Sequence, residues 1–209
     1  NSNDHIKRMR NIEQLGVIHN VYEGVHHSRW EYVMTQLGLL HRLYPSDKKA
    51  GGRPLEGWGL NSDIEFLDTR FSGTEVIQIW ILLSNAGHLP GTFSSEKALM
   101  KYIIKDSRIK EILRNSLKDD NVKLYFDYIL ETEDIYNFNK VLSFFFLEHY
   151  RDQDPELVDL LIEVLKFYCI GCDSLKKEVT PEKMISLDKK RSNFLLIFNR
   201  LRQISYLYL

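Results

Sequence analysis

The sequence predicts an all-α fold in which the helices form a bundle. Sequence signals for helix starts recur along the chain. Each is a serine, threonine or aspartate that is followed by proline or by an acidic residue in the first turn. One stretch, residues 74–83, is apolar around nearly its whole circumference, which is typical of the central helix of a bundle. The sequence carries no hairpin signal and no internal repeat. We therefore expect helices throughout and no sheet.

The sequence of the N-terminal third predicts two helices and one long loop. Residues 4–15 have a helical pattern that the following glycine would end. Ser28 and Glu31 form a capping box, because the serine oxygen accepts a backbone N–H and the glutamate reaches back to the backbone N–H of the serine. A helix should follow, to about Tyr44. Prolines and glycines interrupt residues 45–72, which we interpret as a loop insertion.

The rest of the chain is a succession of helical patterns. After a break at 87–93, helices are expected at 94–104, 107–117, 120–130 and 134–149. Two further helices should begin at Asp154 and Thr180, since each residue offers a side-chain cap and is followed by proline and glutamate. The last helix reaches the end of the chain, with an interruption near Ser186 as the alternative to a continuous helix.

Composition limits the classes of function. The 209 residues are 44% apolar and 27% charged, and a net charge of −1 creates no global field that favours nucleic acid or an anionic membrane. No apolar run reaches the roughly 18 residues of a membrane-spanning helix, and two cysteines suit the reducing cytoplasm. We expect a cytoplasmic protein in which residues 1–209 form a single domain. Because the chain begins with Asn1 and still has a helical pattern at its end, we expect a segment of a longer polypeptide.

Three separated stretches resemble one known family. Residues 6–16 end in Gln-Leu-Gly, residues 27–32 read His-Ser-Arg-Trp-Glu-Tyr, and residues 83–90 read Leu-Ser-Asn-Ala-Gly-His-Leu-Pro. In this order they are similar to the opening helix and the metal-binding segments of HD-domain phosphohydrolases, in the deoxynucleotide triphosphohydrolase branch. Residues 186–190, Ser-Leu-Asp-Lys-Lys, resemble the last metal-binding segment more weakly. The resemblance implies an HD-domain-like helical bundle.

In that family a histidine on one helix, a His-Asp pair at the end of a second and an aspartate on a later one hold a divalent metal. The metal lowers the pKa of a bound water, which attacks phosphorus. By the resemblance, the first histidine falls on Tyr32, the pair falls on Ser84 and Asn85, and the last aspartate falls on Asp188. A tyrosine must lose a proton with a pKa near about 10 to bind a metal well, and serine and asparagine are uncharged. Because of these substitutions we expect no metal and no other cofactor, with a divalent metal at a rebuilt site as the alternative.

Three residues of the family's segments are kept in this sequence. Arg29 keeps a phosphate-contacting position, His88 matches the histidine after the His-Asp pair, and Lys189 follows the last aspartate. Arginine recognises phosphate with two parallel hydrogen bonds and needs no metal. We therefore expect Arg29, His88 and Lys189 to bind phosphate, with Arg29 and His88 as the candidates for a catalytic role. The structural alternatives are that Arg29 pairs with a carboxylate and that His88 bonds a backbone carbonyl.

The leading hypothesis is a catalytically degenerate HD-like domain that serves as a binding, regulatory or assembly module. Its partner would be another protein or other domains of the same polypeptide, with a nucleotide as a further ligand. The competing hypothesis is a metal-dependent nucleotide phosphohydrolase with a rearranged site. A third is a purely structural interaction domain in which Tyr32 fills the space that the metal occupies in the family.

Overall fold

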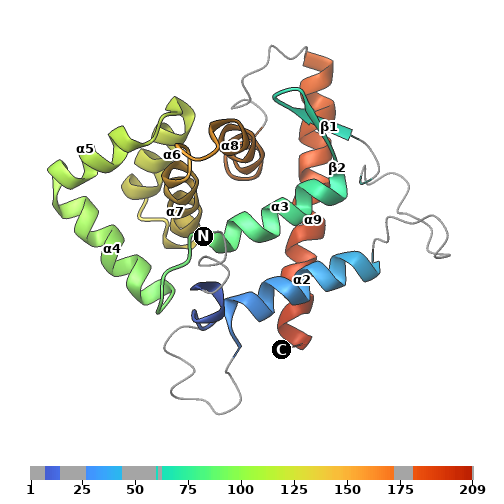
Figure 1. Ribbon diagram of the computed structural model, residues 1–209, viewed down its shortest axis with the longest axis horizontal. Coiled ribbons are helices and arrows are strands. Elements are labelled where there is room, and N and C mark those ends of the chain that lie inside the picture. The colour runs from blue at the N-terminus through green and yellow to red at the C-terminus, as the bar shows by residue number, and fades with distance from the viewer. Residues whose placement is uncertain (1–7, 15–26, 44–59, 61–62, 172–180, 209) are drawn as a thin grey trace. The chain divides into compact units, whose positions relative to one another are not determined.

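The computed structural model describes residues 8–14, 27–43, 60, 63–171 and 181–208, which are mostly helical (Figure 1). The helices are α2 (Arg29–Leu43), α3 (Gly73–Ala86), α4 (Phe93–Lys105), α5 (Ser107–Ser116), α6 (Asp120–Glu131), α7 (Ile135–His149), α8 (Pro155–Cys169) and α9 (Pro181–Tyr208). The strands are β1 (Asp63–Phe66) and β2 (Thr69–Ser72). Within the described part of the chain, no helix has the length and apolar character needed to cross a membrane.

The local signals for helix starts are confirmed. Ser28 N–H donates to Glu31 Oε2 at 2.7 Å, and Glu31 N–H donates to Ser28 Oγ at 3.2 Å, so the capping box begins α2. The hydrogen bond from the Ser28 backbone N–H, with a second from its hydroxyl, lowers the pKa of the Glu31 carboxyl. Aspartate side chains cap α5, α6 and α7 in the same way, each accepting two backbone N–H bonds. The last helix, α9, continues through Ser186 without interruption.

The prediction of a first helix over 4–15 is confirmed for residues 8–10 and is wrong for residues 11–14. Only residues 8–10 are helical, and the chain then turns and pairs with the segment before α2. Gln14 N–H donates to the His27 carbonyl and Arg29 N–H donates to the Ile12 carbonyl, both at 2.7 Å. These backbone bonds replace those that a longer helix would make. They also hold the start of α2 against the N-terminal segment.

The prediction of no sheet is wrong within the interval that the sequence assigned to a loop. Strands β1 and β2 pair antiparallel, with Asp63 opposite Ser72 and Phe66 opposite Thr69. Leu67 and Asp68 form the turn with φ of 44° and 68°, the left-handed backbone that two-residue hairpin turns require. Glycine and asparagine usually supply this conformation, and their absence here explains why the hairpin left no signal in the sequence.

The chain divides into two compact units, each made of two separate segments. The first unit contains 1–32 and 83–158, and the second contains 33–82 and 159–209. In the first unit, α4 packs on α5 and α7, and α6 packs on α5 and α7. Its buried apolar side chains include Met100, Ile103, Leu117, Val122, Phe126, Ile129, Phe138, Val141, Phe144 and Leu147.

In the second unit, the core is centred on Trp80 of α3, which is completely buried. Four aromatic rings surround it at centroid distances of 5.0–6.4 Å: Tyr168, Phe167, Phe194 and Phe198. The indole N–H donates to the Val164 carbonyl at 3.0 Å, so the one polar group of the side chain is satisfied. This cluster joins α3, α8 and α9 around the indole of Trp80.

Replacement of Trp80 tests this packing. We expect Trp80→Ala to lower the free energy of unfolding by about 3–5 kcal/mol, because a fully buried indole leaves a large cavity. Leu196→Ala is the control, since Leu196 is 45% exposed, and it should change stability by about 0.5 kcal/mol or less. Urea unfolding followed by circular dichroism measures both. A loss below about 1 kcal/mol for Trp80→Ala would contradict a central role for the indole.

Candidate functional site

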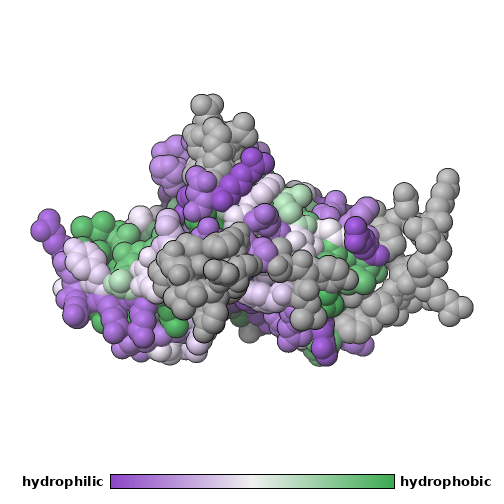
Figure 2. Space-filling view, turned by 90° about the horizontal axis from the view of Figure 1, so that it is seen from below, coloured by the Kyte–Doolittle hydropathy of each residue, from purple (hydrophilic) through white to green (hydrophobic). Residues whose placement is uncertain are grey.

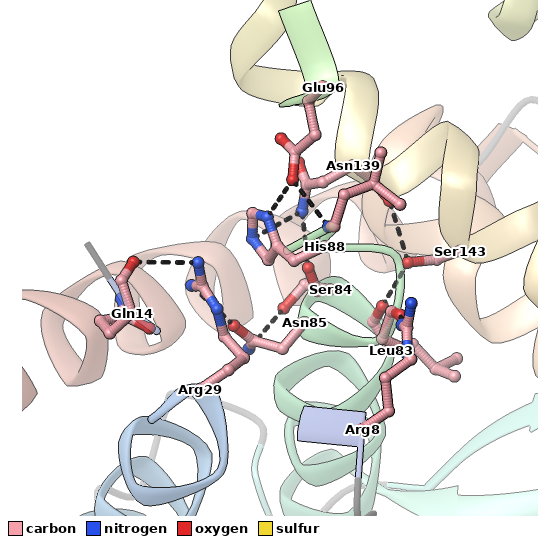
Figure 3. Close-up of polar contacts among 12 residues, drawn as sticks. Arg8, Gln14, Arg29, Leu83, Ser84, Asn85, His88, Glu96, Asn139 and Ser143 are labelled. Atoms are coloured by element: carbon pink, nitrogen blue, oxygen red, sulfur yellow. Dashed lines mark hydrogen bonds and ion pairs between the residues drawn. The ribbon is translucent and has the colours of Figure 1, made fainter. Parts of the chain in front are cut away.

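The sequence stretch that resembles the family's His-Asp pair lies at the C-terminal end of α3. Ser84, Asn85 and His88 are all buried there, and helix α7 lies against them (Figure 3). Gly87 makes this close approach possible. A Cβ at that position would overlap the Asn139 carbonyl oxygen and would lie 2.5 Å from the Ser143 backbone nitrogen. The sequence therefore places a glycine where α3 and α7 leave no room for a side chain.

All four of the last carbonyl groups of α3 accept hydrogen bonds from outside the helix ladder. Ser143 Oγ donates to the Leu83 carbonyl at 2.6 Å, and Asn139 Nδ2 donates to the Ser84 carbonyl at 2.6 Å. The His88 backbone N–H reaches the Asn85 carbonyl at 3.4 Å, and Arg8 Nη2 donates to the carbonyl of Ala86 (Figure 3).

Carbonyl groups at a helix end have no partner within the helix, and leaving them buried and unbonded is costly. The polar residues around the end of α3 are therefore capping groups supplied by the tertiary structure. Two of them, Asn139 and Ser143, are one helical turn apart on α7, so both face α3.

The imidazole of His88 is held on both sides. Its Nδ1 lies 2.8 Å from Glu96 Oε1, and its Nε2 lies 3.2 Å from Asn139 Nδ2. The amide orientation of Asn139 is fixed, because Nδ2 faces the Ser84 carbonyl, which can only accept. The same amide nitrogen therefore donates to Nε2 of His88. It follows that His88 is neutral, with its proton on Nδ1 and donated to Glu96.

Glu96 comes from the first turn of α4 and is completely buried. Its Oε1 accepts from His88 and also from the Leu89 backbone N–H at 3.2 Å. This carboxylate thus fixes both the imidazole and the loop that follows α3. Its second oxygen, Oε2, is buried without a hydrogen-bond partner among the described residues. A metal at this oxygen would need further ligands, and the described residues contain no group of three His, Cys, Asp or Glu side chains that could hold an ion.

Two arginines approach the same helix end from the N-terminal part of the first unit. Arg29 is 4% exposed and donates to Asn85 Oδ1 at 3.4 Å and to the Gln14 carbonyl at 3.1 Å. Its guanidinium carbon lies 5.9 Å from the centre of the Tyr32 ring. Burial lowers the pKa of Arg8, whose guanidinium remains charged at neutral pH. Positive charges at this position are favourable, because the C-terminal end of a helix carries a partial negative charge.

The structure brings five of the predicted site residues into the first unit: Arg29, Tyr32, Ser84, Asn85 and His88. Asp188 and Lys189 belong to α9 of the second unit, and both are exposed. The uncharged donors do not fit a divalent metal. Asn85 Oδ1 accepts from a guanidinium and Asn85 Nδ2 donates to Ser84 Oγ at 3.4 Å, so these side chains bond each other.

The sequence reasoning missed Glu96, Asn139, Ser143 and Arg8. Asn139 and Ser143 left a weak signal, since they are polar residues four positions apart and therefore on one face of a helix that is mostly apolar after Lys140. Glu96 read as an ordinary acidic residue in a first helical turn. Its contact with His88 depends on how α4 folds back onto the loop, which local patterns do not encode.

Comparison of the chain with protein-family models, with curated proteins and with solved structures finds no match. The resemblance to HD-domain proteins therefore rests on the residues quoted above.

A pair of glycine substitutions tests the close approach of α3 and α7. We expect Gly87→Ala to lower the free energy of unfolding by about 3 kcal/mol or more, because the new Cβ meets backbone atoms of α7. Gly38→Ala should instead raise it by about 0.5–1 kcal/mol, since Gly38 lies within α2 with nothing near its Cβ position. Thermal and urea unfolding measure both variants. Equal effects of the two substitutions would contradict the packing described here.

The arrangement around His88 predicts its tautomer. Nitrogen-15 NMR of the side chain should show a neutral imidazole protonated at Nδ1, because Asn139 donates to Nε2. Asn139→Asp should lower the free energy of unfolding by about 1–3 kcal/mol, as it replaces a donor by an acceptor opposite the Ser84 carbonyl. The exposed Asn115→Asp is the matched control and should be nearly neutral. An Nε2-protonated ring would show that the Asn139 amide is oriented the other way.

Proposed function

We propose that this chain is a catalytically inactive HD-like helical domain that serves as an interaction module. One observation carries the proposal: the side chains at the end of α3 cap the helix and bond each other. Asn139, Ser143 and Arg8 are engaged with the α3 carbonyls, and His88 is held by Glu96 and Asn139. Hydrolysis at phosphorus needs a group that activates water, and none of these side chains is disposed to do so.

The family's metal chemistry finds little support in these residues. A divalent ion would have to displace the guanidinium of Arg29 from Asn85 and would gain only uncharged oxygens in exchange. Tyr32 is 2% exposed and its ring faces Arg29, which supports the interpretation that the aromatic side chain fills the space of a lost metal. The same contacts weigh against phosphate binding. Arg29 would have to give up Asn85, the Gln14 carbonyl and its buried position to reach an anion.

The experiment combines metal analysis with nucleotide hydrolysis on the purified chain. We expect no stoichiometric Mn, Fe, Zn or Ni by plasma mass spectrometry, and no turnover of deoxynucleoside triphosphates with added Mn²⁺ or Mg²⁺. One equivalent of bound metal together with metal-dependent hydrolysis would overturn the proposal in favour of a phosphohydrolase with a rearranged site.

Nucleotide binding without hydrolysis is tested separately by thermal shift. A nucleotide at 100 times its Kd stabilises the folded state by about 2.7 kcal/mol, and we expect no such shift with any of the common nucleotides. A shift that Arg29→Ala abolishes, while its unliganded stability is measured in parallel, would show that the phosphate-binding role expected for Arg29 survives in this chain.

A further inference from the structure

The outward face of α4 carries a row of three lysines. Lys97, Lys101 and Lys105 follow one another at intervals of four residues, and all three are exposed. Residues four apart lie one above the other on a helix, so the ammonium groups form a stripe over about 12 Å of helix length. The opposite face of α4 holds the buried Glu96, Met100 and Ile103, which fixes the stripe on the outside.

These lysines are not neutralised within the described part of the chain. None of their three ammonium groups has an ion pair or hydrogen bond to a described residue. Neighbouring cations on α5 behave differently, since Lys110 and Arg114 both pair with Asp127, at 3.4 Å and 2.7 Å. The stripe therefore carries positive charge without an ion-pair partner, whereas the cations of the neighbouring helix are paired.

Exposed apolar side chains border the stripe. Phe93 and Ile104 lie on one side of it and Tyr102 on the other, and these side chains are 49%, 40% and 57% exposed. The ring of Phe93 meets that of Tyr136, which is 76% exposed, at a centroid distance of 5.5 Å. Figure 2 shows apolar surface next to strongly hydrophilic surface over the end of the first unit that α4 and α5 form. Apolar surface gathered beside unpaired charge marks an interaction site more often than scattered single residues do.

The local charge contrasts with that of the chain. Residues 93–118 contain seven basic and three acidic residues, a net charge of +4, whereas the chain as a whole carries −1 and the remainder therefore −5. The positive charge is thus confined to a short part of an otherwise acidic chain, which favours a short acidic segment over a long polyanion or a charged membrane. The size of the stripe, two helical turns, fits such a segment.

We propose that the exposed face of α4 binds an acidic amphipathic segment of a partner protein. Carboxylates of the segment pair with Lys97, Lys101 and Lys105, and its apolar side chains cover Phe93, Ile104 and Tyr102. Exposed ion pairs contribute little individually and are screened by salt, so the bordering apolar area is needed for a stable complex. This inference rests on the proposed role as an interaction module and names the surface and the chemistry of the partner.

The test uses a fluorescent synthetic helical peptide of about 16 residues, with glutamates four apart between leucines, and a matched peptide with glutamine in their place. We expect the wild-type chain to bind the glutamate peptide at least about tenfold more tightly than the glutamine peptide, and salt to weaken it. The variant Lys97→Gln/Lys101→Gln/Lys105→Gln should lose this preference. The control Arg42→Gln/Arg70→Gln/Arg200→Gln removes three charges that are also exposed but lie elsewhere in the chain, and it should keep the preference. Fluorescence anisotropy measures binding, and circular dichroism checks that both variants fold.

Each other outcome overturns the inference. No binding of the glutamate peptide up to about 1 mM, equal binding of both peptides, or equal loss in both triple variants would show that the stripe does not recognise an acidic segment. Tighter, lysine-dependent binding to phosphatidylserine vesicles or to single-stranded DNA would assign the surface to a membrane or a nucleic acid instead. All these results leave the metal and hydrolysis tests of the proposed function unaffected, so the two proposals fail separately.

Discussion

The C-terminal end of α3 and its contact with α7 constrain the rest of the first unit. A buried helix end needs partners for its last carbonyls, and here they come from α7, the N-terminal segment and the loop that follows. Gly87 lets α7 approach closely enough for Asn139 and Ser143 to reach those carbonyls. The close approach and the capping bonds therefore depend on each other. A side chain at position 87 would separate the helices and would leave buried carbonyls without partners.

This constraint also limits the chemistry. A side chain that donates to a buried carbonyl cannot at the same time act on a substrate without exposing that carbonyl, which costs about 1–3 kcal/mol. His88 illustrates the point, because a general base needs an accessible nitrogen and Nε2 of His88 already accepts from Asn139. The guanidinium of Arg29 is likewise engaged in hydrogen bonds, to Asn85 Oδ1 and to the Gln14 carbonyl. The described hydrogen bonds thus account for His88, Arg29 and the capping side chains without a catalytic role, whereas Oε2 of Glu96 has no hydrogen-bond partner among the described residues.

What the sequence could predict follows from the range of the interactions involved. The capping box at Ser28 and Glu31 was predictable because both partners lie within one helical turn. The burial of most of α3 was predictable from its apolar circumference, although Leu82 is 38% exposed. The contact of His88 with Glu96 was not, since eight residues and a change of direction separate them. The hydrogen bond from Asn139 to the Ser84 carbonyl was even less predictable, because 55 positions separate the two residues. The hairpin was not predictable for a different reason. Leu67 adopts a left-handed backbone conformation that its residue type disfavours, so the sequence carried no sign of a turn there.

Helix α4 connects the buried network with the surface. Glu96 points inward and is fixed by His88 and by the Leu89 backbone, while Lys97 begins the outward stripe at the very next position. Because a helix is rigid, fixing one side of its first turn also fixes which residues face outward over the following two turns. The network around His88 therefore sets the orientation of the basic face, although no lysine of that face belongs to it. The same buried contacts that cap α3 therefore also determine which surface of α4 faces outward.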